Sequence, residues 1–334
     1  MRYIVSIMML ALAVTALAAM AADNDVRYEN YRVSGPYTHK NLDVFFIHGS
    51  DLVADENLMT LNEALKEDKV VVHETGDVQE LAIENKSGRW IFIHAGDIVK
   101  GGRQDRVIHV DILVKPYSKS THLPSFCVEQ GRWSQRGHEN PHAFESSNNI
   151  VSSKELKIAA KLEKSQNKVW SEVDNLQNIL ESSTGVCVRG GRSASSLQLT
   201  LENSEVNKES ADYLKAIKDA MYGDDIIGFA FAINGEINSA DIYRSHELFM
   251  KMWPKLAEAC VVEAIAGLSQ SDGFDLVTAD QIATWLEFAE QEKASQEMIN
   301  EYTRLKVREG ANDVLFETFD AESEGMIHKN VIKR

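Results

Sequence analysis

Short apolar runs separated by turn residues dominate the first part of the chain and predict a β-rich region. Val, Ile, Phe and Trp recur in these runs, often with alternating polarity, as expected for half-buried strands. The predicted strands are Leu42–Ile47, Lys69–His73, Val78–Glu84, Trp90–His94, Arg106–Val114 and Ser125–Val128. Thr60 and Glu63 form a capping box, which predicts a short helix that ends at Leu65.

The middle of the chain changes from strand-like to helical spacing. Residues 131–149 are polar and rich in Ser, Asn, Gly and His, and they predict a surface loop. Ser152 and Glu155 form a second capping box, and apolar residues at helical spacing then continue to Gly185, past a polar turn at Glu163–Lys168. Two strand-like segments follow, at Val186–Val188 and Ser196–Leu201.

The last third combines helices with hairpins. The clearest hairpin joins Ile226–Ile233 to Glu236–Tyr243 through an Asn-Gly dipeptide, which is typical of a type I′ turn. A long, mostly polar helix is predicted from Thr278 to near Gly310. The remaining predicted elements are helices at Glu209–Met221 and Ser245–Ala266, the second bent or restarted at Pro254, and a closing hairpin of Val314–Phe319 with Met326–Lys333.

These elements predict an α+β fold, with a mainly antiparallel β-sandwich or bent sheets and several flanking helices. The β-rich half spans residues 22–135, the helical segment residues 150–185, and the second, α+β half residues 186–334. This length is sufficient for a sizeable core, in one large domain or two small ones.

The first residues predict export. Arg2 precedes an apolar run, Ile4–Ala22, that ends in the small residues Ala19-Met20-Ala21, the pattern read by signal peptidase. We expect cleavage after Ala21 and a protein of the periplasm or the extracellular space, with an uncleaved anchor as the alternative. The run is short for a membrane span, so no integral membrane protein is expected after cleavage.

Composition narrows the classes of partner. The formal net charge is −16 at pH 7, so a phosphate backbone would repel the chain and no nucleic-acid partner is expected. Three cysteines, Cys127, Cys187 and Cys260, are too few for a disulfide scaffold. One disulfide is possible, and the sequence does not choose it.

No metal site is expected from residue spacing. His138-Glu139-Asn140-Pro141-His142 matches the letters of a zinc-protease motif, but Pro141 breaks the helix that the motif requires. The ten histidines are otherwise scattered, without recognised ligand spacing. The sequence leaves the cofactor unidentified.

A glycine-containing basic turn is the first candidate site. Gly101-Gly102 allows several backbone N–H groups to face one point, and Lys100, Arg103 and Arg106 add positive charge. Such a turn is suited to a phosphate or carboxylate. The alternative is a solvated turn whose arginines pair with local acids such as Asp97 and Asp105.

The second candidate site is a strand end. Cys127 and Glu129 share one face of the predicted strand, where Cys127 would serve as a nucleophile and Glu129 as a base or as the residue that orients a histidine. Arg132 and Trp133 follow a glycine and would fold back over a ligand. The alternative is a buried structural cysteine beside a Glu129–Arg132 ion pair.

These two stretches resemble one protein family. Lys100-Gly101-Gly102-Arg103-Gln104-Asp105-Arg106 and Cys127-Val128-Glu129-Gln130-Gly131-Arg132-Trp133 are similar to the domain family named for its association with ADP-ribosylglycohydrolases and the rhodanese–phosphatase superfamily. The resemblance extends over about Pro36 to Asn330, which implies a single domain from residue 22 to 334. The family name implies a link to ADP-ribose or NAD-derived ligands, and the family has no established activity.

Three functions remain open from the sequence. The first is an exported ligand-binding or interaction protein whose pocket holds a small anion such as a nucleotide or sugar phosphate. That pocket would be lined by Arg103, Gln104, Arg106, Glu129, Gln130, Arg132 and Trp133. The second is a hydrolase of an ADP-ribose-like ligand, in which Cys127 or Glu129 acts with His39 or His328. The third is a structural envelope protein that binds partners through its acidic surface and the polar helix predicted near Glu287–Arg308.

Overall fold

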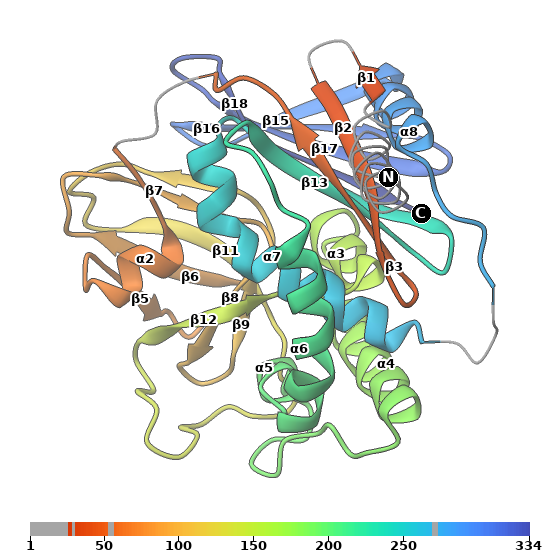
Figure 1. Cartoon of the computed structure of the whole chain (residues 1–334). Helices are drawn as coiled ribbons and strands as arrows, with labels where there is room; N and C mark the ends of the chain where they lie inside the picture. The colour runs from red at the N-terminus through yellow and green to blue at the C-terminus, as the bar shows by residue number, and fades with distance from the viewer. Residues whose placement is uncertain (1–25, 29–30, 53–56, 269–272) are drawn as a thin grey trace, which may run out of the picture.

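A computed structural model describes residues 26–28, 31–52, 57–268 and 273–334 (Figure 1). The predicted export segment, residues 1–21, lies outside the described residues. Within them the fold is α+β, with mainly antiparallel sheets, as the sequence predicts. No helix in these ranges is both long enough and apolar enough to cross a membrane.

The largest sheet joins strands from both ends of the chain. Its described part contains nine strands in the order β1-β2-β3-β13-β14-β18-β17-β16-β15, and every neighbouring pair is antiparallel. The strands are β1 (Val26–Tyr28), β2 (Tyr31–His39), β3 (Leu42–His48), β13 (Ile226–Ile233), β14 (Glu236–Tyr243), β18 (Met326–Lys333), β17 (Asp313–Asp320), β16 (Thr303–Glu309) and β15 (Ala294–Asn300).

Two smaller sheets form the β-rich region on the left of Figure 1. The six-stranded sheet contains β12 (Phe144–Ile150), β8 (Asp97–Gly101), β9 (Arg106–Ile108), β11 (Thr121–Cys127), β6 (Glu80–Asn85) and β5 (Val70–Glu74). The three-stranded sheet contains β10 (Ile112–Val114), β7 (Trp90–Ile93) and β4 (Leu58–Thr60). The β4–β7 pair is parallel.

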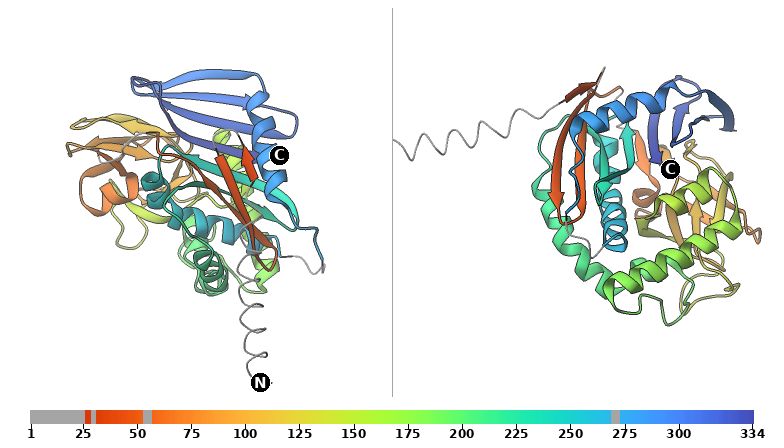
Figure 2. Two further views of the ribbon diagram at one scale, coloured as in Figure 1. Left: turned by 45° about the horizontal axis from the view of Figure 1, so that its top comes forward. Right: turned by 90° about the vertical axis from the view of Figure 1, so that its right-hand side faces the viewer.

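Helices cover both faces of the large sheet (Figure 2). They are α2 (Leu61–Lys66), α3 (Lys154–Lys161), α4 (Gln166–Thr184), α5 (Leu197–Leu201), α6 (Ser204–Asp219), α7 (His246–Ala266) and α8 (Ala279–Gln291). Along β13, Phe229 and Phe231 belong to the apolar cluster that contains α7, whereas Ala230 and Ala232 belong to the cluster under α8. Successive side chains of a strand point to opposite faces. Since both faces of the sheet are covered by helices, β13 is apolar at both sets of positions.

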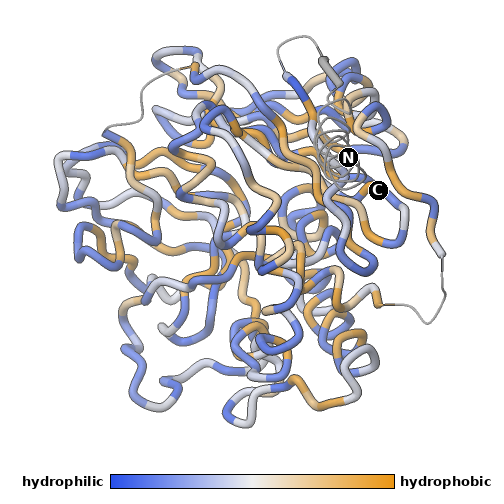
Figure 3. Tube along the Cα trace, in the orientation of Figure 1, coloured by the Kyte–Doolittle hydropathy of each residue, from blue (hydrophilic) through white to orange (hydrophobic). Residues whose placement is uncertain are grey.

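The elements predicted from a capping box and from an Asn-Gly turn are present in the structure. Thr60 and Glu63 cap α2 with a complete capping box. Asn234 and Gly235 have positive φ angles of 54° and 76° and join β13 to β14, as a type I′ turn requires. The hydropathy trace in Figure 3 follows the same pattern, with apolar positions concentrated along the central strands.

The prediction of a single strand over Arg106–Val114 is wrong. It divides into β9 in the six-stranded sheet and β10 in the three-stranded sheet. Between them, Gly96 N donates to Ile108 O, and Ala95 N donates to the Asp111 carboxylate at 2.6 Å. Periodicity alone does not reveal a strand that changes sheets, and this break positions Asp111 in the interior.

Other corrections concern polar segments. The loop predicted at 131–149 ends in strand β12, and the single helix predicted up to Gly185 divides at Lys164, whose φ is 49°. Val186–Val188 is not a strand. The strand predicted at Ser196–Leu201 is instead the helix α5, which Ser196 caps. The helix predicted to reach Gly310 ends at Gln291 and is followed by the β15–β16 hairpin. Therefore the partner-binding helix predicted near Glu287–Arg308 does not exist beyond α8.

Candidate functional site

The two motif segments of the sequence meet at one end of the six-stranded sheet. Strand register pairs Cys127 with Arg106. Beyond these strands, Asp105 N donates to the Glu129 carboxylate at 3.1 Å, and Val128 N donates to Asp105 O at 3.1 Å. The basic turn and the strand end therefore form one cluster.

Two buried carboxylates lie at the centre of this cluster. The side chains of Asp105 and Glu129 are both 0% exposed. Arg136 donates to both oxygens of Asp105, at 2.7 and 3.0 Å, and to Glu129 at 3.3 Å. Arg132 pairs with Glu129 at 2.7 Å, and Ser196 Oγ donates to Asp105 at 2.9 Å. The arginines thus balance the carboxylate pair.

The two carboxyl groups differ in acidity. Burial and the neighbouring Glu129 charge raise the pKa of Asp105, against the hydrogen bonds and charge of Arg136. Burial also acts to raise the pKa of Glu129, but hydrogen bonds from Arg132 and Ser193 outweigh it, and the pKa is lowered. Such divergence is expected of two carboxylates that share one buried site, because the charge of one disfavours ionisation of the other.

Cys127 lies beside this network, in contact with Arg106 and Gln104. Arg106 Nη1 donates to Cys127 Sγ at 2.5 Å, and Cys127 Sγ donates to Gln104 Oε1 at 2.8 Å. Burial raises the pKa of the thiol to about 11, and the Arg106 charge offsets only part of that effect. At neutral pH the thiol is therefore protonated, which does not favour the nucleophilic role predicted for it.

Thiol labelling measures this directly. We expect iodoacetamide at pH 8 to modify Cys187, which is exposed, and to leave the buried Cys127 and Cys260 unmodified in the folded protein. All three should react after unfolding, because none is in a disulfide. Peptide mass spectrometry gives the rates. Modification of folded Cys127 as fast as Cys187 would instead support an active thiol.

The remaining residues of the predicted anion pocket differ in exposure. The Arg103 and Arg106 guanidinium groups lie 5.2 and 5.5 Å from the centre of the Trp133 ring, which is 42% exposed. Gln130 is exposed, whereas Arg106 is fully buried. The accessible part of the predicted set is thus Arg103, Gln130 and Trp133.

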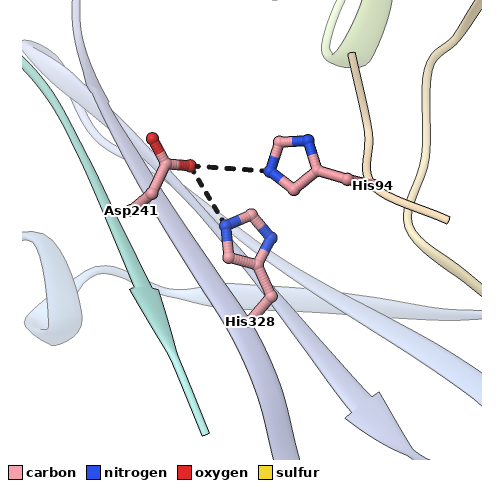
Figure 4. Close-up of side chains that lie close together, drawn as sticks. All are labelled: His94, Asp241 and His328. Carbon is pink, nitrogen blue, oxygen red and sulfur yellow. Dashed lines mark hydrogen bonds and ion pairs between the residues drawn. The ribbon is translucent and has the colours of Figure 1, made fainter. Parts of the chain in front are cut away.

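A second cluster of polar residues lies under the large sheet (Figure 4). His94, Asp241 and His328 are buried, and one ligand atom from each lies within 4.8 Å of the other two. His328 Nε2 donates to Asp241 Oδ1 at 3.0 Å, and His94 Nε2 lies 3.9 Å from the same oxygen. Neither ring nitrogen of His94 has a hydrogen-bond partner among the described residues.

Sheet register explains how distant residues form this cluster. Tyr243 pairs with His328 and Asp241 pairs with Asn330, so these four side chains share one face of β14 and β18. The Tyr243 ring stacks on His328 at 4.5 Å between centroids. His94 immediately follows β7 and reaches the cluster from the three-stranded sheet.

Asp111 holds His328 from the other side. It accepts a hydrogen bond from His328 Nδ1 at 2.8 Å, from Thr318 Oγ1 at 2.6 Å and from Ala95 N at 2.6 Å. This orientation directs His328 Nε2 towards Asp241 and His94.

Charge within the cluster is unevenly distributed. Burial acts to lower the pKa of His328, but Asp111 and Asp241 outweigh it and the pKa is raised. Burial acts to raise the pKa of both carboxyl groups, yet His328 holds each below its ordinary value. Burial lowers the pKa of His94, which leaves a neutral imidazole.

The family model for the ARG and Rhodanese-Phosphatase-superfamily-associated Protein domain, ARPP-1, matches residues 30–332. The chain belongs to this family. This match confirms the resemblance noted in the two sequence motifs. Both polar clusters lie within the matched residues. No curated protein and no solved structure matches the chain significantly.

Sequence reasoning identified one of the two clusters of this ARPP-1 domain. It named His328 only as a possible partner of Cys127 or Glu129, and it named His39, which instead pairs with Asp212 at 3.1 Å near the surface. It missed Arg136 in the first cluster, and His94, Asp111 and Asp241 in the second. The available signal was a charged residue inside an apolar strand, since Asp241 lies between Ala240 and Ile242.

Proposed function

We propose that this ARPP-1 domain binds a divalent transition-metal ion through His94, Asp241 and His328, and that the ion serves hydrolysis. One observation carries the proposal: a fully buried histidine without hydrogen bonds faces a carboxylate and a second, oriented histidine. Burial of an imidazole without partners is costly, and a metal ion supplies a partner.

The ligand spacing supports this role. Zinc binds histidine nitrogen and carboxylate oxygen at about 2.0–2.2 Å, so ligand atoms in a tetrahedral site lie about 3.3 Å apart. The two distances to Asp241 Oδ1, 3.0 Å from His328 and 3.9 Å from His94, lie on either side of that value. All three ligand atoms lie within 4.8 Å of one another, so closing these separations by at most about 1.5 Å would place them around one ion.

Asp111 supports the same interpretation. Histidines that bind a metal usually donate their other ring N–H to a carboxylate or carbonyl, which fixes the tautomer and the ring direction. His328 Nδ1 has such a partner in Asp111 at 2.8 Å. Asp111 itself is held by Thr318 and by a backbone N–H, so the orienting group is rigid.

The ligand set favours hydrolytic chemistry. Two histidines and one carboxylate leave a coordination position for water, whose pKa a bound metal ion lowers. This corresponds to the hydrolase alternative drawn from the sequence, with a different residue set. The predicted anion pocket has weaker support, because Arg106 and Arg132 already bind internal partners. Export, as proposed from the first residues, would place the activity outside the cytoplasm.

Metal titration tests the proposal. We expect protein stripped with a chelator to bind one Zn²⁺ or Mn²⁺ ion per chain, measured by calorimetry and by elemental analysis after dialysis. His94→Leu should weaken binding by more than about 100-fold, because it removes one of three ligands. Hydrolysis of p-nitrophenyl phosphate or p-nitrophenyl acetate should depend on the added metal and be lost in this variant.

His109→Leu is the matched control. His109 is also a shielded histidine with an unpartnered Nδ1, and it is not part of the triad. Its variant should bind the ion as the wild-type chain does. Equal affinity of the wild-type chain and His94→Leu would contradict the metal site.

A further inference from the structure

A cavity of about 200 Å³ lies between the end of α3 and the β15–β16 hairpin. Apolar walls come from residues such as Pro124, Leu305 and Phe316. The polar lining residues are His109, Asp111, Lys161, Lys164 and Glu297. Pockets for drug-sized ligands measure about 300–1,000 Å³, so this cavity suits a smaller molecule.

Lys161 is the unusual residue of this cavity. It is the last residue of α3 and is only 7% exposed. Its ammonium donates to Asn330 Oδ1 at 2.6 Å and lies 4.4 Å from the centre of the Phe316 ring. Burial lowers its pKa to about 8, so the charged form still dominates at neutral pH.

The ammonium of Lys161 has unused donors. A lysine ammonium carries three N–H groups, and Asn330 is its one hydrogen-bond acceptor among the residues that the structure describes. A buried charge with incomplete hydrogen bonding is costly, and an anion in the cavity would complete the set. Lys164, which also lines the cavity, is by contrast half-exposed and pairs with Glu297 at 2.9 Å.

Asp111 connects the cavity to the proposed metal centre. It lines the cavity and also accepts the hydrogen bond from His328. Both of its oxygens accept hydrogen bonds, Oδ1 from Ala95 N and Oδ2 from Thr318 and His328, and its charge is paired with that of His328. The cavity is therefore one side chain away from His328.

We propose that this cavity binds the carboxylate or phosphate group of a small substrate, with Lys161 as its cationic partner. The inference rests on the proposed function, since it makes the cavity the substrate subsite of the metal centre. The small volume excludes a whole dinucleotide and admits one oxyanion with a short apolar body.

Calorimetry with two probes, inorganic phosphate and benzoate, tests the subsite at low salt. We expect the wild-type chain to bind at least one probe, and Lys161→Met to bind it about tenfold or more weakly, because a charged hydrogen bond is lost. Lys164→Met, a change in the same cavity, should remain within about threefold. A wild-type chain that binds neither probe, or a Lys161→Met variant with unchanged affinity, would overturn the proposal.

Two further measurements keep the outcomes separate. Zn²⁺ titration of Lys161→Met should match the wild-type chain. A wild-type chain that binds a probe but no Zn²⁺ argues against the proposed function alone, and one that binds Zn²⁺ but neither probe argues against the subsite alone. Acetic anhydride labelling needs no variant: the bound probe should protect Lys161 and not Lys164, as read by peptide mass spectrometry. Equal labelling of Lys161 with and without a probe also contradicts the subsite.

Discussion

Arg136→Met is expected to lower the free energy of unfolding by about 3–5 kcal/mol, because it removes one of the two arginines that balance two buried carboxylates. Asp105 and Glu129 are fully buried, and Arg136 is 4% exposed with hydrogen bonds to both. Methionine fits the space of the arginine stem but cannot balance either charge. Urea unfolding at pH 7 measures the change, read from the midpoint at constant slope.

Two companion variants separate charge from packing. Arg103→Met lies in the same region, where the guanidinium stacks on the exposed face of Trp133, and should cost less than about 1 kcal/mol. Adding Asp105→Asn to Arg136→Met should recover part of the loss, since one uncompensated charge is then removed. If Arg136→Met unfolds at the urea concentration of Arg103→Met, the network does not stabilise the fold as argued.

His328→Leu is expected to destabilise the metal-free protein by a similar amount, about 3–5 kcal/mol. His328 donates to Asp111 at 2.8 Å and to Asp241 at 3.0 Å, and all three side chains are buried. Removing the imidazole leaves two carboxylates close together in the interior without their shared cation. Thermal or urea unfolding in the presence of a chelator gives the effect.

His94→Leu should behave in the opposite way under the same conditions. Its ring nitrogens have no hydrogen-bond partners among the described residues, so leucine removes an unsatisfied group and the metal-free protein should lose less than about 1 kcal/mol or become more stable. Retained stability with lost metal binding is the pattern of a residue kept for a ligand. A large loss of stability in His94→Leu without metal would assign it a structural role instead.

Local signals predicted the fold where backbone chemistry is decisive. The capping box at Thr60 and the Asn234-Gly235 turn depend on neighbouring residues alone, and both form as expected. The β15–β16 hairpin was mistaken for helix because β15 is an exposed edge strand with polar residues on both faces. Such a strand lacks the apolar alternation that distinguishes strand from helix.

The two clusters differ in how many of their residues could be predicted from the sequence. Arg106 and Cys127 belong to recognisable motifs, and their meeting was predicted, although the sequence left open whether their charges are free or paired. His94, Asp241 and His328 lie in three strand regions with no common motif. Only the pairing of β14 with β18, and the approach of β7, bring them together.

The sequence by itself determined the family, the α+β class and the elements with strong caps and turns, because these depend on residues close together along the chain. The tertiary structure alone decided which charges neutralise one another and which polar groups remain without a partner. In the histidine cluster this pairing joins residues far apart along the chain, such as Asp241 with His328. No local pattern encodes the desolvation that makes a lone histidine or lysine chemically significant.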